Sequence, residues 1–140
     1  MKKLFFALAA IALFASACNE ENNAAPENTF DLDEPVTIAW GETATLEPDQ
    51  LKITFAKILE DSRCPTSVVC VWEGRAVVEL TFTKGNETVT DSLATISSVA
   101  APSNSTTVFG RTVKLLEVTP YPEFAAPIPH GDYQVKIVVN

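Results

Sequence analysis

The sequence is poor in the residues and motifs on which most active sites depend. Its 140 residues include one histidine and no phosphate-binding loop, H-E-x-x-H metal motif or G-x-S-x-G nucleophile motif. The histidine, His130, stands between a proline and a glycine, where a turn residue is expected rather than a metal ligand or a base. We therefore expect no enzymatic activity, no cofactor and no metal site.

Basic residues are scarce as well. The chain has 10 Lys and Arg against 18 Asp and Glu, which gives a net charge of −8. This balance lacks the basic surface of a nucleic-acid-binding protein, so no nucleic acid is expected among the partners. A length of 140 residues, 46% of them hydrophobic, suits one domain and leaves little room for a second.

The first eighteen residues have the pattern of an export signal. Two lysines are followed by an apolar run of eleven residues over 4–14. As a helix this run spans about 16 Å, too short for a hydrocarbon core of about 30 Å, so cleavage is expected. The segment Phe14-Ala15-Ser16-Ala17-Cys18 resembles the lipobox of bacterial lipoproteins, which implies a diacylglycerol on Cys18. The alternative is an ordinary secretory signal that leaves Cys18 as a free thiol.

We accordingly predict a signal peptide over 1–17 and an acidic, disordered tether over 18–34. Without residues 1–17 the chain has 8 basic and 18 acidic residues, a net charge of −10. Asn19 resembles the residue found in lipoproteins sent to the outer membrane, and Glu20-Glu21 resembles the export tag of surface lipoproteins in Bacteroidota. These resemblances imply a lipid anchor in the outer membrane of a Gram-negative bacterium, on its periplasmic or its surface side.

Residues 35–140 have the composition of a small all-β domain. Prolines and glycines separate short runs rich in Val, Ile, Thr and Phe, in which apolar and polar residues alternate. This period predicts strands over 35–40, 42–47, 50–59, 74–83, 87–93, 105–109, 111–118 and 132–139. We expect a single small antiparallel β-sandwich, Ig-like or barrel-like, and a monomer.

Two places in this pattern predict local geometry. Residues 84–87 (KGNE) predict a hairpin with a type II′ turn. Pairing outward from this turn places Asp91 beside the apolar Leu80, for which we expect a β-bulge. The doublet Leu115-Leu116 interrupts the alternation of its strand and predicts a second bulge.

Cys64 and Cys70 form the one specific motif of the domain. With Cys18 used by the lipid, these two cysteines remain as a pair in an oxidising compartment, and we expect a structural disulfide. Closing a loop of about seven residues stabilises the fold by roughly 2.4 kcal/mol. A redox pair and a zinc site completed by His130 remain as alternatives, although the spacing fits neither well.

The stretch DSRCPTSVVCVWEGRA over 61–76 resembles a motif of the form DSRCPxxVxCVWxGxA. This motif occurs in small bacterial lipoproteins and secreted proteins of uncharacterised function. The resemblance implies a fold and a compartment, and no activity. We expect Trp72 to pack on or near the disulfide, Gly74 to allow a turn, and Arg63 to form a local ion pair with Asp61 or Glu73. The motif residues singled out are Asp61, Arg63, Pro65, Trp72 and Gly74.

The sequence therefore favours a non-enzymatic, lipid-anchored envelope module that binds a protein or glycan partner. Its candidate surfaces are the loops over 61–74, 94–105 and 119–131. The alternative is an inhibitor of a protease or lysozyme that presents the disulfide-braced loop. A small hydrolase is the least favoured reading. Ser92, in Asp91-Ser92-Leu93, resembles a short O-glycosylation pattern of Bacteroidota.

Overall fold

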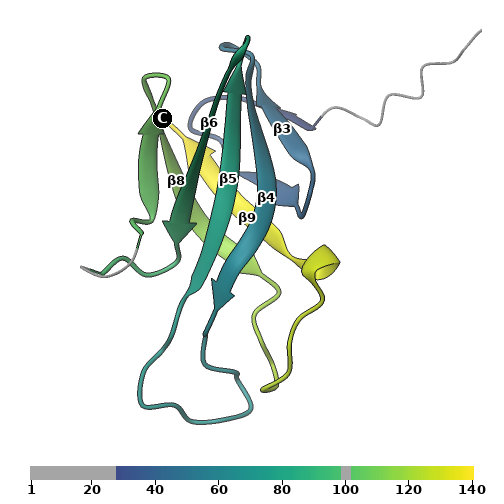
Figure 1. The fold of residues 1–140 in the computed structure, drawn as a ribbon, viewed down its shortest axis with the longest axis vertical. Coiled ribbons are helices and arrows are strands. Elements are labelled where there is room, and N and C mark those ends of the chain that lie inside the picture. Colours follow the sequence, from purple (N-terminus) through teal and green to yellow (C-terminus); the bar gives the residue numbers. More distant parts are fainter. Residues whose placement is uncertain (1–27, 99–101) are drawn as a thin grey trace, which may run out of the picture.

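The computed structural model describes residues 28–98 and 102–140 (Figure 1). They form two β-sheets packed face to face, which confirms the all-β sandwich predicted from the alternation. The helical content of these residues is one short 3-10 helix, η1 (His130–Asp132), and no helix there is long and apolar enough to cross a membrane. The predicted signal peptide (1–17) and Cys18 lie outside the described residues.

The strand order is β1-β3-β4-β5-β6 in the first sheet and β2-β9-β8-β7 in the second. The first sheet contains β1 (Asn28–Phe30), β3 (Thr43–Leu46), β4 (Leu51–Asp61), β5 (Ala76–Lys84) and β6 (Glu87–Ala94). The second contains β2 (Val36–Ala39), β7 (Ser105–Val108), β8 (Arg111–Thr119) and β9 (Gln134–Val139). The eight predicted strands correspond to β2–β9.

The core lies between the sheets, where the inward side chains of alternating positions meet. In β4 and β5 the buried positions include Leu51, Ile53, Phe55, Leu80 and Phe82. The second sheet contributes Ile38, Val113, Val135, Ile137 and Val139. Each such side chain stabilises the fold by about 1.5–3 kcal/mol on burial. The sandwich is therefore a firm platform for the loops at its ends.

The prediction of a disordered tether extending to residue 34 is wrong at its end. Residues 28–30 form β1, which pairs in parallel with β3, and Phe30 is buried in the core. The Asp33 amide donates to the Val139 carbonyl over 2.8 Å. A three-residue strand with one large apolar side chain has no period that a sequence can display. The domain thus includes residues 28–34, and one strand pair of the sandwich is parallel.

The hairpin and one bulge follow the prediction, and the other bulge does not. Gly85 has φ of 60° and is the only residue of the β5–β6 turn with positive φ, as type II′ geometry requires. Leu116 is the extra residue of a bulge in β8, as predicted. Asp91, however, lies directly opposite Leu80 without a bulge. Its carboxylate instead accepts hydrogen bonds from the Ser92 amide and the Thr106 hydroxyl, so it needs no displacement.

The two longest connections described in full leave the same end of the sandwich, at the bottom of Figure 1. One joins β4 to β5 over 62–75 and the other joins β8 to β9 over 120–133. The β5–β6 turn and the C-terminus lie at the opposite end. Asn28, where β1 begins, pairs with Ala44 in the half of the sheet remote from the two connections. We call residues 62–75 and 120–132 together the loop pole.

Candidate interaction site at the loop pole

The two loops of the loop pole form one unit. The Thr66 amide donates to the Pro122 carbonyl over 3.1 Å, and the Ser67 amide donates to the Glu123 carbonyl over 3.0 Å. These bonds tie the segment inside the disulfide loop to a segment more than fifty residues later in the chain. Both loops also begin and end on paired strands. The backbone of the loop pole is therefore restrained by the sheets at its ends and by the hydrogen bonds between the two loops.

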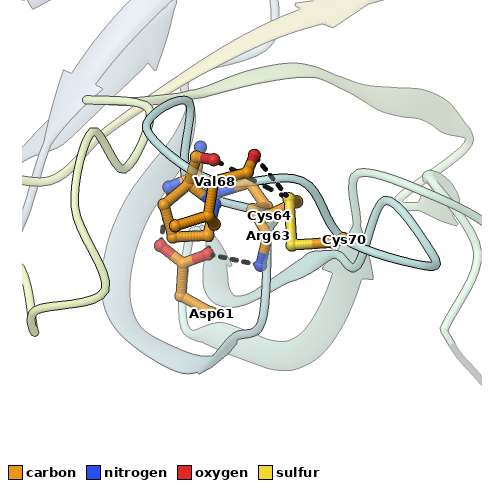
Figure 2. The surroundings of a disulfide bond; sticks show 6 residues. Asp61, Arg63, Cys64, Val68 and Cys70 are labelled. Carbon is orange, nitrogen blue, oxygen red and sulfur yellow. Dashed lines mark hydrogen bonds and ion pairs between the residues drawn. A yellow bond between two sulfur atoms is a disulfide. The ribbon is translucent and has the colours of Figure 1, made fainter.

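Arg63 is the residue that fixes this end of the sandwich, and it is 7% exposed. Its Nε donates to Asp61 Oδ1 over 2.8 Å and its Nη2 to Asp61 Oδ2 over 2.6 Å, a bidentate ion pair (Figure 2). It also donates to the carbonyls of Val118 over 2.5 Å and Pro120 over 2.9 Å. The planar guanidinium suits this fork of acceptors. Arg63 therefore joins the end of β4 to the end of β8 in the other sheet.

The predicted local ion pair of Arg63 is confirmed for Asp61, but its role extends further. Sequence reasoning left Asp61 and Glu73 as alternatives, and Asp61 is the partner. The carbonyls of Val118 and Pro120 lie 55 and 57 residues away, so no local pattern reveals them. The guanidinium also lies 5.0 Å from the centroid of the Tyr121 ring, a cation–π contact.

Tyr133 completes the cluster beneath the loops. Its hydroxyl donates to Asp61 Oδ2 over 2.8 Å. Burial alone would raise the pKa of Asp61, but the hydrogen bonds from Arg63 and Tyr133 outweigh it, and that pKa is lowered. Burial and the hydrogen bond to Asp61 raise the pKa of Tyr133 to about 12. Asp61 is thus an ionised carboxylate occupied by two donors, an arrangement that supports the fold rather than proton transfer.

The predicted disulfide between Cys64 and Cys70 is present, with Cα atoms 5.9 Å apart (Figure 2). The backbone ladder of β4 and β5 continues past both strands to reach it. The Ser62 amide donates to the Arg75 carbonyl, and the Cys64 amide donates to the Glu73 carbonyl, each over 2.8 Å. Residues 28–98 and 102–140 contain no group of three or more side chains placed to hold a metal ion.

Gly74 makes the return from this loop possible, as its place in the sequence predicts. It has φ of +69°, in the left-handed region. A Cβ at this position would lie 1.8 Å from the Ser62 carbonyl oxygen. The loop therefore closes because glycine brings the two backbone segments into contact. Pro65, also in the predicted motif, is half-buried, and its carbonyl accepts from the Val68 amide over 3.2 Å.

The prediction that Trp72 packs on the disulfide is wrong. Trp72 is 82% exposed, and Val69 and Val71 are 102% and 95% exposed. The residues that follow Cys70 therefore point outward into solvent. Val68 and, on the second loop, Tyr121 and Phe124 are also exposed. We call the side chains of Val68, Val69, Val71 and Trp72 the apolar tip.

Two hollows lie at the loop pole. One, of about 440 Å³, lies between the end of β4 and the second loop and is lined by Asp61, Arg63, Phe124, Ile128 and Tyr133, among others. Its central polar groups are bound to one another, as described above. The other, of about 570 Å³, lies beside Trp72. The loop pole thus combines an exposed apolar tip with two open hollows.

The remaining predicted positions do not join this site. His130 lies in η1, at a turn as predicted, with its ring 6.2 Å from that of Trp40. Ser92 is half-buried in β6, opposite Glu79. Part of the predicted loop over 94–105 lies outside the described residues. In comparisons with known proteins, no family model, no curated protein and no solved structure matches this chain.

Proposed function

We propose that this chain is a non-enzymatic module of the cell envelope, lipid-anchored through Cys18 in the outer membrane of a Gram-negative bacterium. It binds a protein partner through the loop pole. One observation carries the binding role: four large apolar side chains of one short loop stand in solvent. The lipobox-like segment supports the anchor.

The exposure of the apolar tip is unusual for a surface that binds nothing. Monomeric proteins scatter single apolar residues over the surface, whereas gathered ones mark interaction sites. Val69, Val71 and Trp72 are each more than four-fifths exposed within four consecutive residues. A tryptophan next to aliphatic side chains is a common centre of binding energy.

The rigidity of the loop pole supports the same role. The disulfide, the Arg63 contacts and the bonds to the second loop restrict the backbone before a partner arrives. A loop ordered in advance loses less conformational entropy on association than a free one. In addition, β1 begins in the half of the domain remote from the loop pole, so the proposed anchor and the apolar tip belong to opposite ends of the domain.

Site-specific photo-crosslinking in the anchored, full-length protein tests this proposal. A photoreactive amino acid at Val69 should form an adduct with a partner in intact cells, and the adduct should disappear when Val71→Asp is added. Val89 provides the matched control, since it is an exposed valine on β6 away from the loop pole. Equal adduct yields from the two positions, or no adduct from Val69, would contradict the binding role.

A second candidate function is inhibition of a protease or lysozyme. It is favoured by the near-complete exposure of Val69 and Val71 on a loop closed by a disulfide, the form in which rigid inhibitors present a chain to a cleft. Titration of a trypsin-like protease, a subtilisin-like protease and a lysozyme with the purified domain tests it. Loss of inhibition in Val69→Ala with unchanged stability would support this function, and no inhibition of any of the three would exclude these targets.

A further inference from the structure

We propose that the partner of the loop pole is a cationic protein, with basic side chains around an apolar cavity that receives the apolar tip. This inference rests on the proposed binding function and specifies the chemistry of its partner. It is drawn from the charges of the loop pole, which has no unpaired Lys or Arg.

The loop pole has no Lys or Arg side chain that is free of a carboxylate partner. Between residues 58 and 83 the basic residues are Arg63 and Arg75. Arg63 is buried against Asp61, and Arg75 pairs with Glu60 over 3.1 Å. The second loop contributes no Lys or Arg, because none occurs between residues 115 and 135. Both guanidinium groups are therefore already neutralised by carboxylates.

Three acidic side chains of the loop pole remain without a cationic partner. Glu73, Glu123 and Asp132 are all exposed, and none forms a salt bridge among residues 28–98 and 102–140. Glu73 directly follows Trp72, and the Glu123 carbonyl holds the amide of Ser67. The loop pole thus presents exposed apolar side chains together with these three carboxylates, which we call the anionic rim. Complementary charge on a partner would speed association and select against acidic proteins.

Two other occupants fit this surface less well. Valine and tryptophan side chains would insert favourably into a bilayer. Anionic headgroups, however, would repel three carboxylates that have no lysine beside them. A second copy of this chain would bring two identical anionic rims together, and like charges across an interface are costly. A cationic protein is therefore the occupant that the charges favour.

The experiment uses envelope preparations that contain the anchored, full-length protein with the photoreactive residue at Val69. One variant neutralises the rim (Glu73→Gln, Glu123→Gln and Asp132→Asn). A matched variant neutralises three exposed acids outside the loop pole (Glu34→Gln, Glu47→Gln and Glu87→Gln). Both variants are checked for unchanged thermal unfolding. Vesicles of phosphatidylcholine with or without phosphatidylglycerol serve as the membrane probe.

We expect the adduct yield to fall roughly threefold or more between 50 and 300 mM NaCl, because salt screens exposed charges. The rim variant should lower the yield by a similar factor and lose most of the salt dependence, while the matched variant should retain both. Mass spectrometry of the adduct should identify a protein of net positive charge.

Other outcomes overturn the inference in distinguishable ways. An adduct that is indifferent to salt, or that both variants reduce equally, leaves a binding loop pole with a partner of different chemistry. Adducts with lipid, together with flotation on vesicles, identify a membrane-binding surface. Adducts between two copies identify self-association. If Val69 and the control position Val89 behave alike, the proposed function itself fails.

Discussion

At the scale of single residues, Arg63 has the largest structural role among the charged side chains. Its side chain and that of Asp61 are 5% and 12% exposed, so the pair is removed from water. Such a pair adds little or no net stability relative to a well-packed apolar replacement, but removal of one member leaves the other buried and uncompensated. Arg63 also donates to the backbone carbonyls of Val118 in β8 and of Pro120 in the loop that follows it.

Replacement of Arg63 by leucine should therefore destabilise the domain by about 3–5 kcal/mol, a large part of an ordinary stability of about 5–15 kcal/mol. Urea unfolding of the variant gives the measurement. Arg75→Leu is the control, because its pair with Glu60 is substantially exposed on both sides and should contribute about 0–1 kcal/mol. Equal losses from the two substitutions would refute the role assigned to Arg63.

Because the pKa of Tyr133 is raised in the folded chain, the free energy of unfolding depends on pH in the alkaline range. Its pKa is about 12 in the folded chain and about 10 in the unfolded chain, so the folded state holds the proton more tightly. The stabilisation is complete below pH 10 and is lost as the pH rises from about 10 to 12. Tyr133→Phe should flatten this decline and cost about 1 kcal/mol near neutrality through the lost hydrogen bond. Tyr121→Phe, at an exposed tyrosine, should leave the decline unchanged in unfolding measured across this pH range.

At the scale of elements, the loop over 62–75 depends on the close approach at Gly74. An alanine there pays about 1–2 kcal/mol for the left-handed backbone and must also displace the Ser62 carbonyl. We expect Gly74→Ala to lose roughly 3 kcal/mol or more in denaturant unfolding. Gly85→Ala is the matched control, since φ there is also positive and no atom lies within 4 Å of the added Cβ. If the two variants lose the same amount, the contact with Ser62 is not the constraint.

The sequence predicts the elements whose information is local. Eight strands follow from period-two alternation, and the β5–β6 register follows from one hairpin turn. The bulge at Leu116 is visible because two adjacent leucines cannot both face the core. β1 is not visible, because its stability comes from a parallel partner and from the burial of Phe30. Two further register shifts in β4, after Phe55 and after Ile58, leave no signal in the sequence.

The candidate site also has features that the sequence predicts and features that it does not. The disulfide and the turn at Gly74 are predictable from residue type and spacing. The acceptors of Arg63 are not, since they come from the far end of β8. The exposure of Trp72 is also hidden, because whether an aromatic side chain packs on a nearby disulfide depends on what else fills that space. Here the Trp72 side chain is exposed.

At the scale of the whole molecule, β8 is fastened at both ends to the opposite sheet. At the loop pole, Arg63 donates to the Val118 carbonyl near the end of β8. At the other end, Arg111 begins β8 and its Nε donates to Asp49 Oδ2 over 2.5 Å, from the turn between β3 and β4. Lys84 lies 3.9 Å from the same carboxylate. Arginine–carboxylate contacts thus complement the apolar core at both ends of the sandwich.

The extent of the folded domain is a further prediction at this scale. A fragment of residues 28–140 should have the same free energy of unfolding as a fragment of residues 19–140. A fragment of residues 35–140 lacks Phe30, which is 6% exposed, and should lose about 3–5 kcal/mol. Phe30→Ala within the 28–140 fragment separates the side chain from the strand pairing. Equal stability of the 28–140 and 35–140 fragments would show that residues 28–34 do not belong to the domain.

The side chains of the apolar tip do not pack in the core, and this has a consequence for how the protein changes over evolutionary time. Val69 and Val71 make no contribution to the core, while the residues that hold their backbone lie elsewhere in the loop pole. Mutations at these two positions are therefore expected to be nearly neutral for folding, and under the proposed function they act on recognition alone. If the proposed function holds, selection can redirect the protein to a new partner while its scaffold stays constant, and related sequences should diverge first at the tip.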